Sequence, residues 1–325
     1  VWSGRASTLS WRGAAIGDAM GHPTEFISSF KNIVQTYGSQ GITGFELYWT
    51  REGKRFAPYT DDTQMAEVVL RALVESRRTT LDLDETMTRM ANGFIAWANN
   101  PQGGHRAPGG ACLEGCRALQ RGVHWSQAGG ATAGGCGSVM RAYPFGLIFH
   151  DDTDKAQRWA VQHSKLTHRD PIAFAACAAM GVGVAQVLQG ESVEAVTSAM
   201  IKAARGYSPE TADMIERAVD EAGSGVEPKV TLQRLRGWAA HEAIAAGAYI
   251  FVRHANDPRA AILEGATLVR IGGAIYLIWL GVTRLRKAAG GVHVRVSPYD
   301  NRVVDIKFFD KRGLDIDRNT ERKIE

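Results

Sequence analysis

Apolar residues recur every three or four positions along most of the chain, which is the spacing of one buried helix face. The clearest case follows Thr60-Asp61-Asp62, where an apolar stripe at Met65, Val69 and Leu73 predicts a helix to about Ser76. The same spacing predicts further helices at 83–99, 191–205, 209–222, 236–254 and from about Arg259 onward. Strand-like alternation is scarce before residue 290, so we expect the main body to be all-α.

One predicted helix is apolar on every side. Residues 172–188 are nearly all small or apolar, which predicts a central helix that is buried all round. Pro171 suits the first position of this helix. His168 stands just before it, and a lone histidine at the mouth of a buried helix is either a structural group or a catalytic one.

Residues 9–21 predict a helix built from small side chains, which allows a neighbouring element to approach closely. Asp18 interrupts this surface, and its carboxylate needs a partner because the unpaired burial of a charge is costly. We expect Pro23 to end the helix and to leave Glu25 just beyond it. Glu25 is then either a solvated loop carboxylate or a site residue.

Two adjacent carboxylates, Asp61 and Asp62, follow Thr60 at the start of the striped helix. We expect them in an exposed first turn, where side-chain oxygens meet free backbone N–H groups. Such oxygens either cap the helix or offer hard ligands to Mg²⁺, Mn²⁺ or Ca²⁺. The segment alone leaves both interpretations open.

Two stretches are rich in glycine. Residues 100–110 predict a loop that is either disordered or shaped around a ligand, with His105 and Arg106 as its titratable or charged members. Residues 129–146 place small side chains before a helix. Their backbone N–H groups can cradle phosphates, or the glycines permit a tight helix–helix crossing.

The pattern changes after Leu285. Alternation at 292–296 and 303–309, with a turn at 297–301, predicts a β-hairpin. We therefore expect a helical domain over 1–285 and an atypical C-terminal tail over 286–325.

Composition narrows the class of protein. The chain has 325 residues with an apolar share of 45%, and its 38 basic and 34 acidic residues give a net charge of +4. This charge is too mild to predict nucleic-acid or membrane binding. The longest apolar run, 271–282, is shorter than the roughly 20 residues that span a bilayer. Four cysteines match no Cys-x-x-Cys metal pattern, so we expect buried thiols in a reducing cytoplasm. They are Cys112, Cys116, Cys136 and Cys177.

Five segments, taken in order from about Trp11 to Gly265, resemble the sequence blocks of the ADP-ribosylglycohydrolases. This family includes the dinitrogenase-reductase-activating glycohydrolase and the ADP-ribosyl-acceptor hydrolases. One such block alone would be a weak signal, whereas five in order are specific. The segments are Gly17 to Phe26, Thr60-Asp61-Asp62-Thr63 with Met65, Gly135 to Arg141 followed by Pro144 and Gly146, Leu166-Thr167-His168, and Gly237-Trp238 to Glu242.

The resemblance implies a compact orthogonal all-α bundle with two Mg²⁺ or Mn²⁺ ions in a central cleft. It implies a hydrolase that removes ADP-ribose from a modified protein side chain or from a related ADP-ribose compound. Thr60, Asp61 and Asp62 would be metal ligands, and Glu25 and Asp62 would be catalytic. The residues expected along the ADP-ribose are Gly137, Ser138 and His168.

The chain departs from the family near its C-terminal end. The second metal block of the family, Gly-Asp-x-Asp-Thr/Ser, should follow residues 262–266, but no acidic residue stands between Glu264 and Asp300. Three explanations stay open: a shifted reading frame near residue 267, a degenerate member that binds ADP-ribose without cleaving it, or substitute ligands from Asp315 and Asp317. A structural role is a further alternative, since by resemblance the fold also occurs in a lens crystallin.

Overall fold

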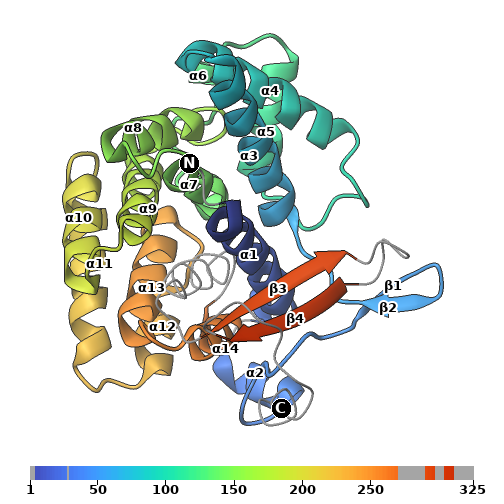
Figure 1. Ribbon diagram of the computed structural model, residues 1–325, viewed down its shortest axis with the longest axis vertical. Coiled ribbons are helices and arrows are strands. Elements are labelled where there is room, and N and C mark those ends of the chain that lie inside the picture. The colour runs from blue at the N-terminus through green and yellow to red at the C-terminus, as the bar shows by residue number, and fades with distance from the viewer. Residues whose placement is uncertain (1–3, 28, 270–289, 297–303, 311–325) are drawn as a thin grey trace.

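The computed structural model describes residues 4–27, 29–269, 290–296 and 304–310 (Figure 1). The described part is dominated by helices, which confirms the predicted all-α body. The helices are α1 (Gly4–Glu25), α2 (Phe30–Tyr37), α3 (Asp61–Thr79), α4 (Leu83–Asn99), α5 (Gly110–Gln120), α6 (Trp125–Ala128), α7 (Tyr143–Ile148), α8 (Thr153–Ser164), α9 (Pro171–Gln189), α10 (Val193–Arg205), α11 (Pro209–Gly223), α12 (Pro228–Leu235), α13 (Ala240–Arg253) and α14 (Pro258–Leu268), with a 3₁₀ helix η1 at Cys136–Arg141.

Helix α9 lies at the centre of the core. It packs against α7, α8, α10 and α13, and its Ala and Gly residues let these helices approach closely. The helix is long and apolar enough to cross a membrane, but 78% of its most apolar window is buried inside the protein. It is therefore the core helix that its composition predicts.

Two predicted helix boundaries are wrong. Helix α1 continues through Pro23 to Glu25, because proline removes only one donor and the last turn is held by Thr24. The Thr24 hydroxyl donates to the carbonyl oxygens of Gly21 and of Ala266 on α14. The helix predicted at 236–254 begins only at Ala240, since Arg236 and Gly237 adopt positive φ angles of 52° and 84° that interrupt a helix.

Two short antiparallel hairpins complete the described residues. Strands β1 (Trp49–Arg51) and β2 (Lys54–Phe56) form one that the sequence pattern did not predict. Strands β3 (Gly290–Val296) and β4 (Val304–Asp310) form the predicted C-terminal hairpin. Its turn at 297–301, the domain boundary at 285 and Asp315 and Asp317 lie outside the described residues, so the statements about them stay predictions.

Candidate functional site

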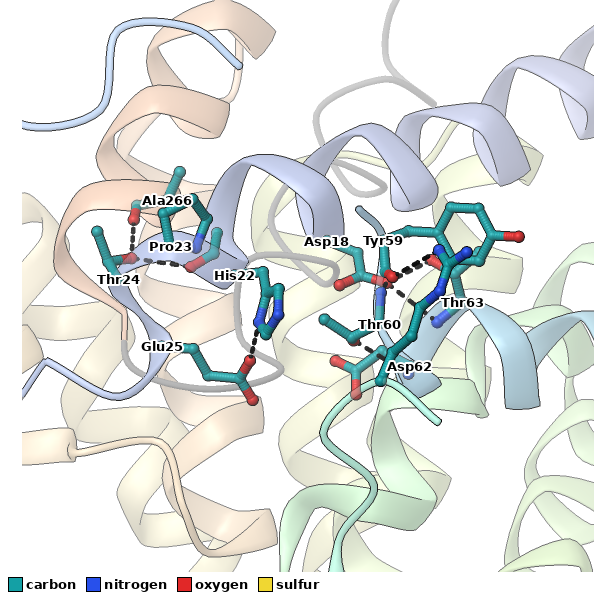
Figure 2. Close-up of polar contacts among 12 residues, drawn as sticks. Asp18, His22, Pro23, Thr24, Glu25, Tyr59, Thr60, Asp62, Thr63 and Ala266 are labelled. Atoms are coloured by element: carbon teal, nitrogen blue, oxygen red, sulfur yellow. Dashed lines mark hydrogen bonds and ion pairs between the residues drawn. The ribbon is translucent and has the colours of Figure 1, made fainter. Parts of the chain in front are cut away.

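The N-terminus of α3 is held by a carboxylate from α1. Asp18 is buried, and its Oδ2 accepts hydrogen bonds from the backbone N–H groups of Thr60 at 2.7 Å and Thr63 at 3.2 Å. The Thr63 hydroxyl donates to the same oxygen at 2.6 Å. Asp18 thus has the hydrogen-bond partners that its burial requires, and these bonds fix the start of α3 against α1 (Figure 2).

The acidic turn itself is buried rather than exposed, which corrects the expectation from sequence. Thr60, Asp61 and Asp62 are 2%, 4% and 7% exposed. The loop at 100–110 covers this turn, because the Asp61 N–H donates to the Arg106 carbonyl at 2.9 Å. Gln64 also donates to two carbonyl oxygens of that loop. The glycine-rich loop is therefore an ordered wall of the site.

Thr60 caps α3, as one of the two interpretations predicted. Its hydroxyl is the capping group, so neither Asp61 nor Asp62 is the N-cap of this helix. The Thr60 hydroxyl accepts from the Asp62 N–H at 3.2 Å. The backbone N–H groups of Asp61 and Gly109 lower the pKa of the Asp61 carboxyl, against the larger effect of burial that raises it. The helix therefore begins with one capping hydroxyl and two acidic side chains that its capping does not consume.

Burial and mutual repulsion dominate the electrostatics of the site. Burial raises the pKa of Asp61 and Asp62 well above the usual range, and the neighbouring charges of Asp18 and Glu25 raise both further. Burial likewise raises the pKa of Asp18, against hydrogen bonds that lower it. The charge of Arg141 lowers the pKa of Asp62. Four carboxyl groups thus interact in one small volume.

Glu25 faces this volume from the last turn of α1 (Figure 2). Its Oε2 lies 2.7 Å from Nδ1 of His22, and its side chain is only 11% exposed. Pairing with His22 orients the carboxylate. Glu25 is therefore a largely buried group, held by His22, and not a solvated loop carboxylate.

The glycine-rich segment at η1 and His168 form the opposite wall. His168 is 2% exposed, and burial together with the charge of Arg141 lowers its pKa to about 3. A Cβ atom at Gly137 would lie 2.9 Å from Cε1 of His168 and 2.6 Å from Sγ of Cys112. A side chain at position 137 would force Cys112 or His168 to move, so the close packing expected of this segment is present, and its binding of phosphate stays a prediction.

Ser138 points into the protein. Its side chain is fully buried, accepts a hydrogen bond from the Ser164 hydroxyl at 2.9 Å and lies 3.5 Å from Sγ of Cys177. The hydroxyl is thus engaged inside the core, and a ligand on this wall would meet the backbone of Ser138. All four cysteines are free and buried, as predicted.

A buried arginine that the sequence reasoning did not single out joins the two walls. Arg141 is fully buried, donates to the Gly137 carbonyl at 2.6 Å and to the Thr167 hydroxyl at 2.5 Å, and lies over the Phe94 ring. Because Thr167 accepts from Arg141, its own proton is available for Nδ1 of His168 at 2.7 Å. This relay favours the His168 tautomer that carries its proton on Nε2.

Two exposed aromatic rings border the site. Phe26 follows Glu25 and is 60% exposed, and Trp238 is 50% exposed with its ring centroid 6.3 Å from that of Phe26. The Trp238 carbonyl accepts from the Cys136 N–H, which ties this ring to the glycine-rich wall. The spacing of apolar residues predicts buried helix faces, so it does not identify exposed aromatic side chains such as these.

The site fits a hard divalent cation in the chemistry of its donors. Carboxylates of raised pKa, packed together, are stabilised by a positive charge, and carboxylate and hydroxyl oxygens are the ligands that Mg²⁺ and Mn²⁺ prefer. Among the described residues, however, no three His, Cys, Asp or Glu side chains converge closely enough to hold an ion by themselves. Thr60 would thus have to serve as a ligand beside Asp61 and Asp62.

Comparison with known proteins places these residues in a family. A family model described as ADP-ribosylglycohydrolase matches residues 8–274. The chain belongs to the ADP-ribosylglycohydrolase family. This membership confirms the resemblance inferred from the five sequence segments, all of which lie within the matched range.

Individual relatives agree with the family. The chain is 27% identical over 185 residues to the ADP-ribosyl-[dinitrogen reductase] glycohydrolase of Rhodospirillum rubrum, covering 56% of this chain and 58% of that protein. It is 27% identical over 215 residues to an uncharacterised protein of Archaeoglobus fulgidus, covering 66% of each. The matches thus span less than two thirds of these relatives.

A solved structure described as an ADP-ribosylglycohydrolase-related protein complex has the same fold. It matches with a TM-score of 0.55 and 18% identity, covering 86% of each chain.

Proposed function

We propose that this protein is a metal-dependent hydrolase that removes ADP-ribose from a modified protein side chain or from a related ADP-ribose compound. The observation that carries the proposal is that Asp61 and Asp62 begin α3 as buried carboxylates, with the charge of Glu25 near enough to raise the pKa of both. Family membership supports a glycohydrolase reaction.

The chemistry of a ribosyl bond suits these groups. Cleavage builds positive charge at the anomeric carbon, and the attacking water must lose a proton. Asp61 and Asp62 supply negative charge beside that carbon. Glu25, oriented by His22, takes up the proton of the water. A divalent ion held by Thr60, Asp61 and Asp62 would orient the ribose hydroxyls and lower the pKa of a bound water.

The opposite wall suits the rest of the ligand. Backbone N–H groups of a glycine-rich segment bind a diphosphate well. The neutral His168 directs its Nε2 atom toward Gly135 and Gly137. This atom lies 3.6 Å and 3.3 Å from the points where Cβ atoms would stand on the two glycines. It therefore offers a neutral donor along the proposed path of the ADP-ribose.

A second candidate is a binder of ADP-ribose that does not cleave it. This alternative is favoured by the lack of any acidic residue between Glu264 and Asp300, where the family carries its second metal block. One ion held by three ligands binds weakly, and two ions would need more carboxylates than the described site contains.

The deciding experiment measures release of ADP-ribose from ADP-ribosyl-arginine and ADP-ribosyl-serine peptides with Mg²⁺, with Mn²⁺ and with a chelator. The variants are Asp61→Asn in the site and Glu67→Gln as a control, since Glu67 lies on the same helix but pairs with the exposed Arg71. Metal-dependent release that is lost only in Asp61→Asn supports the hydrolase. No release, with ADP-ribose still raising the melting temperature, supports the binder.

A further inference from the structure

The β1–β2 hairpin projects from the body of the protein (Figure 1). Its two-residue turn is formed by Glu52 and Gly53, which adopt positive φ angles of 51° and 74°. The register places Trp49 opposite Phe56, and Arg51 opposite Lys54 on the same face. The base of the hairpin is apolar and its tip is charged.

The charges at the tip are mostly of one sign. Arg51, Lys54 and Arg55 are all exposed, and none of them forms an ion pair within the part of the chain that the structure describes. Glu52, in the turn between them, pairs with none of the three. Like charges directly opposite one another, as at Arg51 and Lys54, destabilise a hairpin.

A fourth cation, the buried Arg106, lies beneath this surface on the side of the site. The point where a side chain at position 103 would place its Cβ atom lies 2.5 Å from Nη2 of Arg106 and 3.5 Å from Nη1 of Arg51. The residue there is glycine, so the two guanidinium groups approach each other closely. Arg106 is only 6% exposed, stacks on the Tyr59 ring at 4.2 Å and leaves its Nε without a hydrogen-bond partner. Two guanidinium groups converge here, and no ion pair to either is found among the described residues, so the positive charge at this end of the hairpin is not neutralised within the described protein.

The position of the hairpin indicates which part of the substrate its positive charges would meet. The Arg106 carbonyl accepts from the Asp61 N–H, and the Trp49 ring lies 6.3 Å from that of His22, the partner of Glu25. The hairpin therefore borders the acidic cluster. It projects away from α9 and α13, which adjoin the glycine-rich wall proposed for the diphosphate (Figure 1). The molecule on the hairpin side is thus the acceptor to which ADP-ribose is attached.

Apolar side chains accompany the basic ones. Phe45, Leu47 and Tyr48, just before β1, are 46%, 48% and 41% exposed. Exposed aromatic and aliphatic groups next to arginines are typical of surfaces that bind proteins. A purely polyanionic ligand would make no favourable contact with these apolar side chains.

We propose that the basic hairpin surface, made of Arg51, Lys54 and Arg55, docks an acidic stretch of the ADP-ribosylated acceptor protein. This inference rests on the proposed function and narrows its substrate class to acceptors with carboxylates near the modified residue. Docking is electrostatic at the hairpin and apolar at its base, so it raises kcat/KM for macromolecular substrates and leaves the chemistry at Glu25 unchanged.

The test compares two peptides that carry the same ADP-ribosylated residue, one flanked by glutamates and one by glutamines, with the free ADP-ribosyl amino acid. The variant R51E/K54E/R55E reverses the hairpin charge. The control R158E/K202E/R217E makes the same change at exposed positions on α8, α10 and α11, away from the site. None of the six residues is part of the acidic cluster or of the glycine-rich wall.

For the wild type we expect kcat/KM for the glutamate-flanked peptide to exceed that for the glutamine-flanked peptide roughly tenfold at low salt, and to converge at high salt. The hairpin variant loses this preference and keeps its rate on the free ADP-ribosyl amino acid, whereas the control keeps both. An unchanged preference in the hairpin variant overturns the proposal. An equal loss on the free compound does so too.

Direct binding separates this inference from the proposed function. Anisotropy of a fluorescent, unmodified glutamate-rich peptide should show binding to the wild type and to the control but not to the hairpin variant, even in a protein that releases no ADP-ribose. If the hairpin variant instead loses only binding to a long ADP-ribose polymer, the surface serves a polyphosphate and the acidic-acceptor proposal is wrong.

Discussion

Asp18 on α1 accepts a 2.6 Å hydrogen bond from the hydroxyl of Thr63 on α3, and through this contact the first helix positions the acidic turn at Thr60–Asp62. The carboxylate also receives two backbone N–H groups that α3 cannot satisfy within itself. Asp18 thus determines where the two site carboxylates lie.

We therefore expect Asp18→Ala to lower the free energy of unfolding by about 3 kcal/mol, because buried donors lose a charged acceptor. Relief of the repulsion between Asp18 and Asp61 offsets a part of this loss. Asp18→Asn keeps one acceptor oxygen and should lose about 1 kcal/mol. Urea denaturation measures both values, and an Asp18→Ala variant as stable as the wild type would contradict the capping role.

Divalent ions should stabilise the folded protein. If Thr60, Asp61 and Asp62 bind Mn²⁺ in the folded state alone, an ion concentration of 100 times Kd adds about 2.7 kcal/mol to the free energy of unfolding. We expect Mn²⁺ to raise the melting temperature of the wild type and of Glu67→Gln but not that of Asp62→Asn, and a chelator to reverse the effect. An equal shift in all three proteins would place the ion elsewhere.

His168 should make stability depend on pH. Its pKa is lowered to about 3 in the folded protein, against an ordinary value of 6.5, so the unfolded chain binds more protons between these values. The contribution of His168 is complete above pH 6.5 and is lost as the pH falls toward 3. The free energy of unfolding that is lost through His168 between pH 6.5 and pH 5 is about 2 kcal/mol. Buried His163, whose pKa is also lowered, adds to the same trend.

The variant His168→Gln isolates this contribution. We expect its free energy of unfolding to fall less steeply than that of the wild type between pH 6.5 and pH 5. Denaturant titrations at several pH values give the two slopes, and parallel slopes would show that His168 is not a buried neutral group.

Two glycines of α5 should respond oppositely to alanine. A Cβ at Gly115 would lie 2.6 Å from the Leu166 carbonyl oxygen and 2.7 Å from Cα of Thr167, so Gly115→Ala must move the backbone next to His168. We expect a loss of about 3 kcal/mol. A Cβ at Gly110 meets nothing within 4 Å, and Gly110→Ala should be neutral or stabilising by up to about 1 kcal/mol. Thermal melting of the two variants checks both signs.

The sequence predicts the helical body well, because stripes such as Met65, Val69 and Leu73 report burial directly, and all three side chains are fully buried. The β1–β2 hairpin escapes the same approach, since three-residue strands are too short to show alternation. Its only strong signal is the Glu52-Gly53 turn. The predicted end at Pro23 was wrong because a proline two residues before the end of a helix removes only one backbone hydrogen bond.

The site is harder to predict than the fold. The adjacent carboxylates and Glu25 could be found from their residue types, and the need of Asp18 for a partner could be stated, but that partner lies 42 residues away. Arg141 is missed because a charged side chain is normally expected at the surface, whereas here carbonyl, hydroxyl and sulfur groups and the Phe94 ring surround it. Periodicity also cannot show which way Ser138 points within a short 3₁₀ helix.

The hydrogen bond from Thr24 to Ala266 joins residues that are 242 positions apart in the chain. Together with the bond from the Ile42 N–H to the Thr267 hydroxyl, it docks α14 against the end of α1 that carries Glu25. During synthesis on the ribosome, α3 to α13 can pack as they emerge, but the bond from Thr24 to Ala266 cannot form until α14 has been made. The contacts that Thr24 makes beyond its own helix are therefore completed only when the last helix of the described body has formed.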